Sequence, residues 1–151
     1  FINKINNELG YEHQIDVYGP LVDIEYKKLL GSNYKGVITP DKILKTLNLY
    51  NYLVLPTYWY GEGIPGVIIE ALSLGIPVIA SNHRSIPEII GDGNGMLFSP
   101  EDYQKFRNII NLAIDSSSEY KKMSNNCFNT FDKSFNCKII NRKIVSLIFS
   151  I

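Results

Sequence analysis

The sequence predicts a doubly wound α/β fold, in which helices cover a parallel sheet. Two short apolar runs indicate it, because strands buried in a parallel sheet read as continuous hydrophobic segments. These runs are Tyr52–Leu55, which Pro56 stops, and Pro77–Ser81. Between them apolar residues recur at helical spacing up to Gly75, so the segment reads as strand, helix and strand.

The residues before this unit predict alternating helices and strands. Apolar residues near the start recur at helical spacing, and the first expected strand stops at Gly19-Pro20. Thr39 followed by Pro40 is typical of a capped helix N-terminus. The expected elements are helices at 1–9, 23–30 and 40–49 and strands at 13–18 and 34–38.

The residues after the unit predict one more strand and three helices. Gly91-Asp92-Gly93 reads as a turn, and the strand at Met96–Phe98 follows it. The expected helices lie at 99–116, 119–131 and 137–149.

The composition is that of a globular protein of one domain. It has 151 residues, of which 45% are hydrophobic and 20% charged. Fifteen basic and fifteen acidic residues leave no formal net charge, which argues against a nucleic-acid partner. Cys127 and Cys137 lack metal-ligand spacing and read as reduced structural thiols. Without a signal-peptide pattern or a bilayer-length apolar stretch, the expected location is cytoplasmic.

Two glutamates flank the N-terminus of the helix expected between the two apolar runs. Glu62 precedes it, and Glu70 follows Pro65 by about five residues, or ~7 Å along the helix axis. Unpaired N–H groups at a helix N-terminus favour a phosphate, whereas a carboxylate beside phosphate would repel it. The acids therefore suit hydroxyl groups on either side of a phosphate, as in a nucleotide sugar.

The segment Glu62–Glu70 resembles the E-x7-E motif of the group 1 glycosyltransferases, retaining enzymes of the GT-B fold. An ordinary strand, helix and strand unit with solvated glutamates would explain the apolar pattern, but not the glycines and proline beside a carboxylate. An ordered set over about forty residues is a stronger signal than two glutamates. The neighbouring segments that agree with the family are Pro56-Thr57, Ala71–Ala80, Ile86–Ile90 and Gly91–Gly95.

The resemblance implies a Rossmann-like C-terminal half that binds the donor. Glu62 is then the catalytic residue and holds hydroxyls of the donor sugar, and Glu70 holds the ribose diol. The family pattern places Glu62, Gly63, Ile64, Pro65, Gly66 and Val67 near sugar and phosphate, and Glu70, Gly19, Ile38, Thr39 and Ile43 near the nucleotide. From the residues alone, Ile43 would instead read as a core residue.

For the parent protein, the resemblance implies retaining transfer of a sugar from a nucleotide-diphosphate sugar to a glycan, lipid-linked or polysaccharide acceptor. The expected role is biosynthesis of cell-surface polysaccharide or glycoconjugate. No metal or other cofactor is expected, because the chain has no DxD pair. In the family the last helix crosses onto the other domain. Its apolar residues are a less favoured candidate for peripheral contact with the inner face of the membrane.

By comparison with the family, residues 1–151 are expected to form a single, incomplete nucleotide-sugar-binding domain. The N-terminal acceptor domain, the first strand and a basic pair that holds the pyrophosphate would be missing. The strands at Asp16 and Val54 would then pair directly, or a strand would come from outside. We expect the 151 residues alone to be inactive. The alternative is a truncated, inactive donor-binding module that acts with a partner chain.

Two groups of side chains near the motif keep open roles. Tyr58-Trp59-Tyr60 suits a sugar or base platform and packing of the loop equally well. His83-Arg84 stand where family members usually carry small glycines. Arg84 reads more readily as a solvated surface arginine than as a contact for phosphate or acceptor, and His13 reads as structural.

Overall fold

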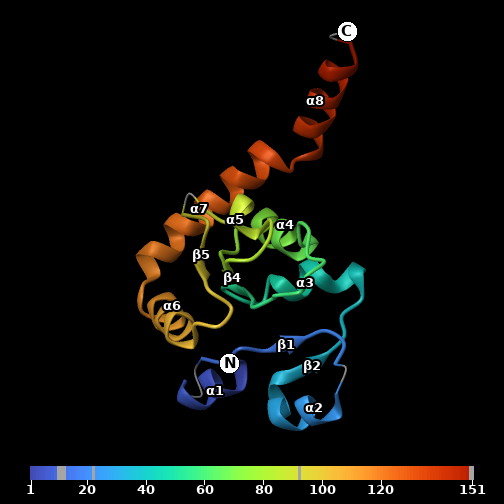
Figure 1. The fold of residues 1–151 in the computed structure, drawn as a ribbon. Helices are drawn as coiled ribbons and strands as arrows, with labels where there is room; N and C mark the ends of the chain where they lie inside the picture. The colour runs from blue at the N-terminus through green and yellow to red at the C-terminus, as the bar shows by residue number, and fades with distance from the viewer. Residues whose placement is uncertain (10–12, 22, 92, 150–151) are drawn as a thin grey trace. The chain divides into compact units, whose positions relative to one another are not determined.

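The computed structural model describes residues 1–9, 13–21, 23–91 and 93–149. The chain divides into two compact units, Phe1–Ile43 and Leu44–Ile151, and each is described by itself. Helices alternate with parallel strands in both units (Figure 1). The expected α/β fold with parallel strands is therefore confirmed, while the single domain expected over 1–151 stays a prediction.

The first unit contains a two-stranded parallel sheet. Val17 pairs with Tyr34 and Tyr18 with Gly36. Asp23 caps the second helix, since its carboxylate accepts from the Glu25 N–H at 2.8 Å. The elements are α1 (Ile2–Glu8), β1 (Val17–Tyr18), α2 (Ile24–Leu30), η1 (Gly31–Asn33), β2 (Tyr34–Gly36) and η2 (Pro40–Lys42), and α3 (Ile43–Leu47) begins at the boundary.

A buried side chain explains why β1 is shorter than the expected strand at 13–18. The Asn6 amide donates to the Ile15 carbonyl at 3.0 Å, and its Oδ1 accepts from the Ile15 N–H at 2.8 Å. Asn6 thus satisfies both backbone groups of Ile15, as a paired strand would. Regular pairing begins only at Val17.

The second unit contains a three-stranded parallel sheet in the order β3-β4-β5. Val54 pairs with Ile79 in the first ladder, and Ile79 pairs with Met96 in the second. The strands are β3 (Leu53–Leu55), β4 (Val78–Ser81) and β5 (Gly95–Phe98), and the helices are α4 (Gly66–Ser73), α5 (Ile86–Ile89), α6 (Tyr103–Asp115), α7 (Ser117–Ser134) and α8 (Cys137–Phe149).

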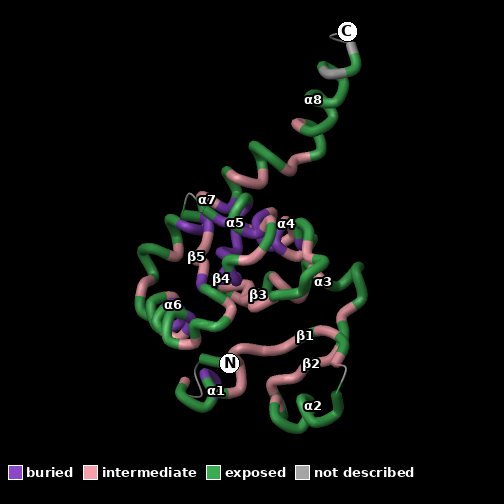
Figure 2. Tube along the Cα trace, viewed as in Figure 1, coloured by how far each residue is buried: buried purple, intermediate pink, exposed green. Residues whose placement is uncertain are grey.

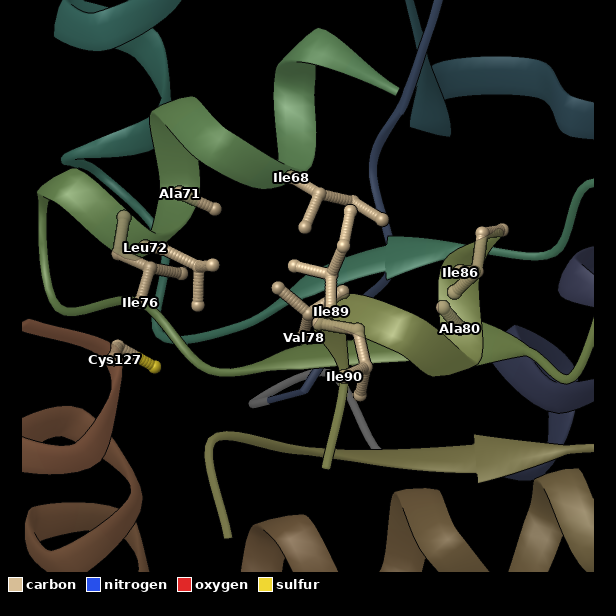
Figure 3. Close-up of a cluster of buried hydrophobic side chains, with 10 residues drawn as sticks. All are labelled: Ile68, Ala71, Leu72, Ile76, Val78, Ala80, Ile86, Ile89, Ile90 and Cys127. Atoms are coloured by element: carbon tan, nitrogen blue, oxygen red, sulfur yellow. The ribbon is translucent and has the colours of Figure 1, made fainter. Parts of the chain in front are cut away.

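The core of the second unit lies between α4, α5 and the sheet. Figure 3 shows Ile68, Ala71 and Leu72 of α4 facing side chains of β4 and α5, with Cys127 of α7 at one end. A fully buried isoleucine or leucine contributes about 1.5–3 kcal/mol, so this cluster holds α4 firmly on the sheet. The buried residues of the cluster are Ile68, Ala71, Leu72, Ile76, Val78, Ala80, Ile86, Ile89, Ile90 and Cys127.

Burial differs sharply between the sheet and the last helix (Figure 2). Every residue of β4, the central strand, is buried. By contrast, Ile144 and Val145 of α8 are about half exposed. In the described part of the chain, no helix has both the length and the apolar character needed to cross a membrane.

The direct pairing expected between the strands at Asp16 and Val54 would join the two units, so it stays a prediction. One local detail differs from the expectations. Thr39 occupies the position before η2, but its side chain makes no capping hydrogen bond. Pro65 lies just before α4, and its carbonyl accepts the first bond of the helix, from the Ile68 N–H at 3.0 Å.

Candidate functional site

The N-terminus of α4 has open backbone donors. Pro65 precedes the helix with φ −65°, and no side chain caps this end. The earliest bond at this end joins the Ile68 N–H to the Pro65 carbonyl, so the N–H groups of Gly66 and Val67 have no intrahelical acceptor. These donors and the partial positive charge of the helix end suit an anion.

Gly63 and Gly66 leave free space beside these donors. A Cβ atom at either glycine would have no described atom within 4 Å. Neither residue is among the described glycines with positive φ, so any residue could adopt their backbone conformation. Packing and backbone conformation therefore do not account for these two glycines, whereas close approach of a ligand to the backbone would.

The Glu62 carboxylate is half-buried and is held by its own loop. The Thr57 hydroxyl donates to Glu62 Oε2 at 3.0 Å, and the Glu62 N–H donates to the Trp59 carbonyl at 3.1 Å. Because Oε1 and the remaining lone pairs of Oε2 are not used by Thr57, the carboxylate keeps acceptor capacity. Glu62 can therefore accept from a ligand hydroxyl while Thr57 holds it.

Glu70 lies in the second turn of α4, four residues after Gly66 and about 6 Å along the axis at 1.5 Å per residue. It is half-buried, and its carboxylate has no hydrogen-bond or ion-pair partner among the described residues. Both carboxylate oxygens therefore keep acceptor capacity for hydroxyl groups of a ligand.

Side chains at the end of β4 contact the loop that leads to Glu62. The buried Ser81 hydroxyl donates to the Thr57 carbonyl. His83 Nε2 lies 3.1 Å from the Trp59 carbonyl oxygen, which requires the proton on Nε2. The Arg84 guanidinium carbon lies 4.0 Å from the centre of the Tyr60 ring, in cation–π geometry.

Sequence reasoning missed the roles of Thr57 and Ser81. The available signal was their position, since each lies at or just after the carboxyl end of a parallel strand, where α/β sheets place their sites. The aromatic residues of the same loop do not pack into the core. Tyr58, Trp59 and Tyr60 are 69%, 71% and 83% exposed.

The predicted site residues fall into two groups. Glu62, Gly63, Ile64, Pro65, Gly66, Val67 and Glu70 come together around the start of α4 in the second unit. Gly19, Ile38, Thr39 and Ile43 lie in the first unit, at the ends of β1 and β2 and the start of α3. The placement of one unit against the other is not determined.

The nucleotide-site candidates of the first unit are one glycine with open space around it and three residues that differ in burial. Gly19 has φ +129°, a conformation that favours glycine, and no described atom lies within 4 Å of where its Cβ would be. Its N–H donates to the Gly36 carbonyl at 2.9 Å, and its carbonyl accepts from the Tyr34 hydroxyl at 2.9 Å. Ile38 and Ile43 are half-buried and Thr39 is exposed. Ile43 is therefore not a fully buried core residue.

One hollow contains none of the predicted site residues. It has a volume of about 240 Å³ and is lined mainly by apolar atoms of Gly93, Met96, Leu112, Glu119, Lys122 and Met123. Over the described ranges, no three histidine, cysteine, aspartate or glutamate side chains come together as a metal site requires. The turn residue Asp92 lies outside the described residues.

Comparison with known proteins identifies the family of this segment. The family described as Glycosyl transferases group 1 matches residues 24–130. The Escherichia coli serotype-specific mannosyltransferase WbdA is 31% identical over 90 residues, which cover 60% of this chain and 11% of that protein. The Escherichia coli UDP-Gal:alpha-D-GlcNAc-diphosphoundecaprenol alpha-1,3-galactosyltransferase is 30% identical over 134 residues, which cover 88% of this chain and 31% of that protein.

Solved structures agree on the fold. Crystal structures of Anabaena Alr3699/HepE in complex with UDP and with UDP-glucose match with a TM-score of 0.73, at 22% and 23% identity. The matched regions cover 85% of this chain and 36% of the HepE chain. The chain thus spans only a fraction of the length of these relatives, between 11% and 36%.

Proposed function

This chain belongs to the group 1 glycosyltransferases, and from that premise we propose that it binds a nucleotide-diphosphate sugar at the N-terminus of α4. The whole protein then transfers the sugar, with retention, to an acceptor. The observation that carries the proposal is the uncapped helix N-terminus between Glu62 and Glu70, with free space at Gly63 and Gly66.

The diphosphate interacts with the start of α4. Backbone N–H groups of Ile64, Gly66 and Val67 face the phosphate and the sugar, and the helix end offsets negative charge on the leaving group. An anion at an exposed helix N-terminus is stabilised by about 0.3–1 kcal/mol. This contribution is small, so the helix end orients the diphosphate and other groups supply most of the affinity.

The two glutamates recognise hydroxyls at the two ends of the donor. Glu62 accepts from hydroxyls of the donor sugar beside the bond that breaks, which makes it the catalytic residue of this chain. Glu70 accepts two hydrogen bonds from the ribose diol. Because each hydrogen bond to a charged group contributes about 1.5–3 kcal/mol, Glu70 provides the largest single share of nucleotide affinity.

The first unit carries the other residues that we propose for nucleotide binding. The open space at Gly19 suits close approach of the nucleotide to the backbone. The backbone at Ile38 and Thr39 and the half-buried side chain of Ile43 contact the base. The structures of HepE with UDP and UDP-glucose support a nucleotide-sugar ligand for this fold.

The acceptor is a glycan, lipid-linked or polysaccharide molecule, and the protein acts in the biosynthesis of cell-surface polysaccharide. The name of the galactosyltransferase relative, which contains a diphosphoundecaprenol-linked sugar, supports a lipid-linked acceptor. We place the reaction in the cytoplasm, at the inner face of the membrane. Its acceptor-binding part comes from an N-terminal domain or a partner chain.

The 151 residues by themselves bind donor without turning it over. Transfer requires donor and acceptor held together in a closed site, and this chain matches only 36% of the HepE chain. Under this view the basic groups that complete the pyrophosphate site also lie elsewhere. Affinity of the isolated chain for UDP is then on the order of millimolar.

A chemical-shift titration of the 151-residue chain tests the proposal. UDP, uridine and inorganic pyrophosphate are added separately to wild type, Glu70→Gln and the control Glu101→Gln. Glu101 is an exposed residue outside the site, so its substitution removes the same charge without touching the helix. We expect Glu70→Gln to weaken UDP and uridine by tenfold or more, since it loses about 1.5–3 kcal/mol.

Pyrophosphate separates the helix end from the ribose site. It is expected to bind wild type and Glu70→Gln equally, with shifts at Gly66 and Val67. Equal binding of UDP and uridine by wild type and Glu70→Gln would remove the ribose assignment. Absence of any UDP-dependent shift at α4 would remove the nucleotide site itself.

A further inference from the structure

We propose that His83 and Arg84 are positioning residues for the donor sugar. They hold the loop Thr57–Glu62, here called the aromatic loop, so that the Glu62 carboxylate stays at the start of α4. The inference rests on the proposed function and goes beyond it, because neither residue belongs to the donor site described above. Both lie between β4 and α5 and reach Glu62 only through other residues.

The aromatic loop has little packing of its own. Four consecutive residues, Tyr58 to Gly61, are exposed, and they connect Thr57 to Glu62. A loop with few buried contacts opens at low cost in free energy. The position of Glu62 therefore depends on hydrogen bonds and ring contacts along the loop.

His83 holds the middle of the loop. Its Nε2 donates to the Trp59 carbonyl at 3.1 Å, and the same carbonyl accepts the Glu62 N–H at 3.1 Å. One oxygen thus joins the β4–α5 segment to the backbone of Glu62. Loss of the imidazole would leave this carbonyl with the Glu62 bond alone.

Arg84 holds the far part of the loop by stacking its guanidinium on Tyr60 at 4.0 Å. Its backbone has φ +52°, the left-handed region, and it is the only non-glycine residue with positive φ among those described. That conformation costs an arginine roughly 1 kcal/mol relative to glycine. Glycine would suit the backbone better, so the stacking side chain supplies a physical reason for arginine at this position.

The inward end of the loop is held independently of these two residues. Ser81 donates to the Thr57 carbonyl, and the Thr57 hydroxyl donates to the Glu62 carboxylate. His83 and Arg84 therefore restrict motion of Glu62 rather than fold the loop. Their substitution should change recognition of the sugar and leave the free energy of unfolding nearly unchanged.

Arg84→Gly tests this directly in the 151-residue chain, because glycine removes the side chain and suits the backbone. His83→Ala and Arg84→Lys accompany it, and Arg142→Ala on the exposed helix α8 is the matched control. Each variant is titrated with UDP and with UDP-glucose. Trp59, the single tryptophan of the chain, reports motion of the loop through acrylamide quenching of its fluorescence.

The expected readout is the affinity ratio between UDP-glucose and UDP. We expect this ratio to fall threefold to tenfold in Arg84→Gly and His83→Ala, while affinity for UDP stays within twofold. Quenching of Trp59 should rise in both variants, thermal stability should stay the same or increase in Arg84→Gly, and Arg84→Lys should recover part of the ratio. Arg142→Ala should match wild type.

Three outcomes contradict the inference in different ways. If the affinity ratio between UDP-glucose and UDP is the same in wild type, Arg84→Gly and His83→Ala, the positioning role is wrong and the proposed function stands. Wild type that binds neither ligand overturns the proposed function and the inference together. A ratio that falls only in step with lost thermal stability shows a purely structural role and overturns the inference alone.

Discussion

The Thr57 hydroxyl donates to the Glu62 carboxylate at 3.0 Å and accepts from the Trp59 N–H at 3.2 Å. One side chain just after β3 therefore links the backbone of the aromatic loop to the carboxylate that precedes α4. A hydroxyl can do both because it is donor and acceptor at once. The strand end, the loop and the candidate catalytic residue form one hydrogen-bonded unit.

Thr57→Val removes this hydroxyl and keeps the side-chain shape. We expect binding of UDP-glucose to weaken about fivefold to tenfold while UDP itself is little affected, because the Glu62 carboxylate loses the hydrogen bond that positions it and not a bond to the ligand. Calorimetric or NMR titration of both ligands measures it. Thr57→Ser, which keeps the hydroxyl, is the control, and equal affinities of Val and Ser variants would remove this role from Thr57.

Gly95→Ala should destabilise the second unit by several kcal/mol. A Cβ at Gly95 would overlap the Val78 carbonyl oxygen, which belongs to the pairing of β4 with β5. Gly91→Ala is the matched control, because its Cβ would meet no described atom within 4 Å. Urea unfolding of the two variants checks the difference, and similar midpoints would contradict the register at Gly95.

Tyr52→Phe should keep or increase stability, by up to about 1 kcal/mol. The Tyr52 hydroxyl is buried without a hydrogen-bond partner among the described residues, while its ring packs edge-on against Tyr120 at 5.5 Å. Burial of the hydroxyl raises the pKa of Tyr52, and the charge interaction with Tyr120 raises it further. Removing an unsatisfied hydroxyl avoids its desolvation cost and keeps the ring contact. A lower melting temperature for Tyr52→Phe would show that this hydroxyl has a partner.

The two cysteines should differ in reactivity toward iodoacetamide. Cys137 is exposed, whereas Cys127 is buried and its Sγ donates to the Asn94 carbonyl at 3.3 Å. Burial raises the pKa of the Cys127 thiol to about 12, so very little thiolate forms near neutral pH. Mass spectrometry of native protein should show alkylation at Cys137 alone, and urea should expose Cys127. Rapid native alkylation of Cys127 would contradict its burial.

The Cys127 thiol makes the free energy of unfolding depend on pH in the alkaline range. A pKa raised from 9.0 to about 12 means that the folded state holds the proton more tightly than the unfolded state. This contribution is fully present below pH 9 and is lost as the pH rises toward 12. The free energy of unfolding of wild type should therefore fall faster over that range than that of Cys127→Ala. Equal slopes in urea unfolding across this window would contradict the assignment.

The sequence alone determined the local elements around α4 and where its two glutamates fall along them. Apolar runs bounded by Pro56 and Gly75 predicted the β3, α4 and β4 unit, because burial on both faces of a parallel strand leaves a continuous hydrophobic pattern. The positions of Glu62 and Glu70 relative to a helix start follow from the rise of a helix. These features depend on residues close together in the chain.

Tertiary structure decided the features that join distant segments. Asn6 shortens β1 by bonding Ile15, and Ser81, His83 and Arg84 reach the aromatic loop from the end of the neighbouring strand β4 and the segment after it. No periodicity records such contacts, because each depends on where two segments meet after the core has formed. Sequence spacing determines which side chains share one face of a helix or strand. Packing determines which side chains of other segments that face contacts. The contacts of Thr57 and Arg84 follow only from that packing.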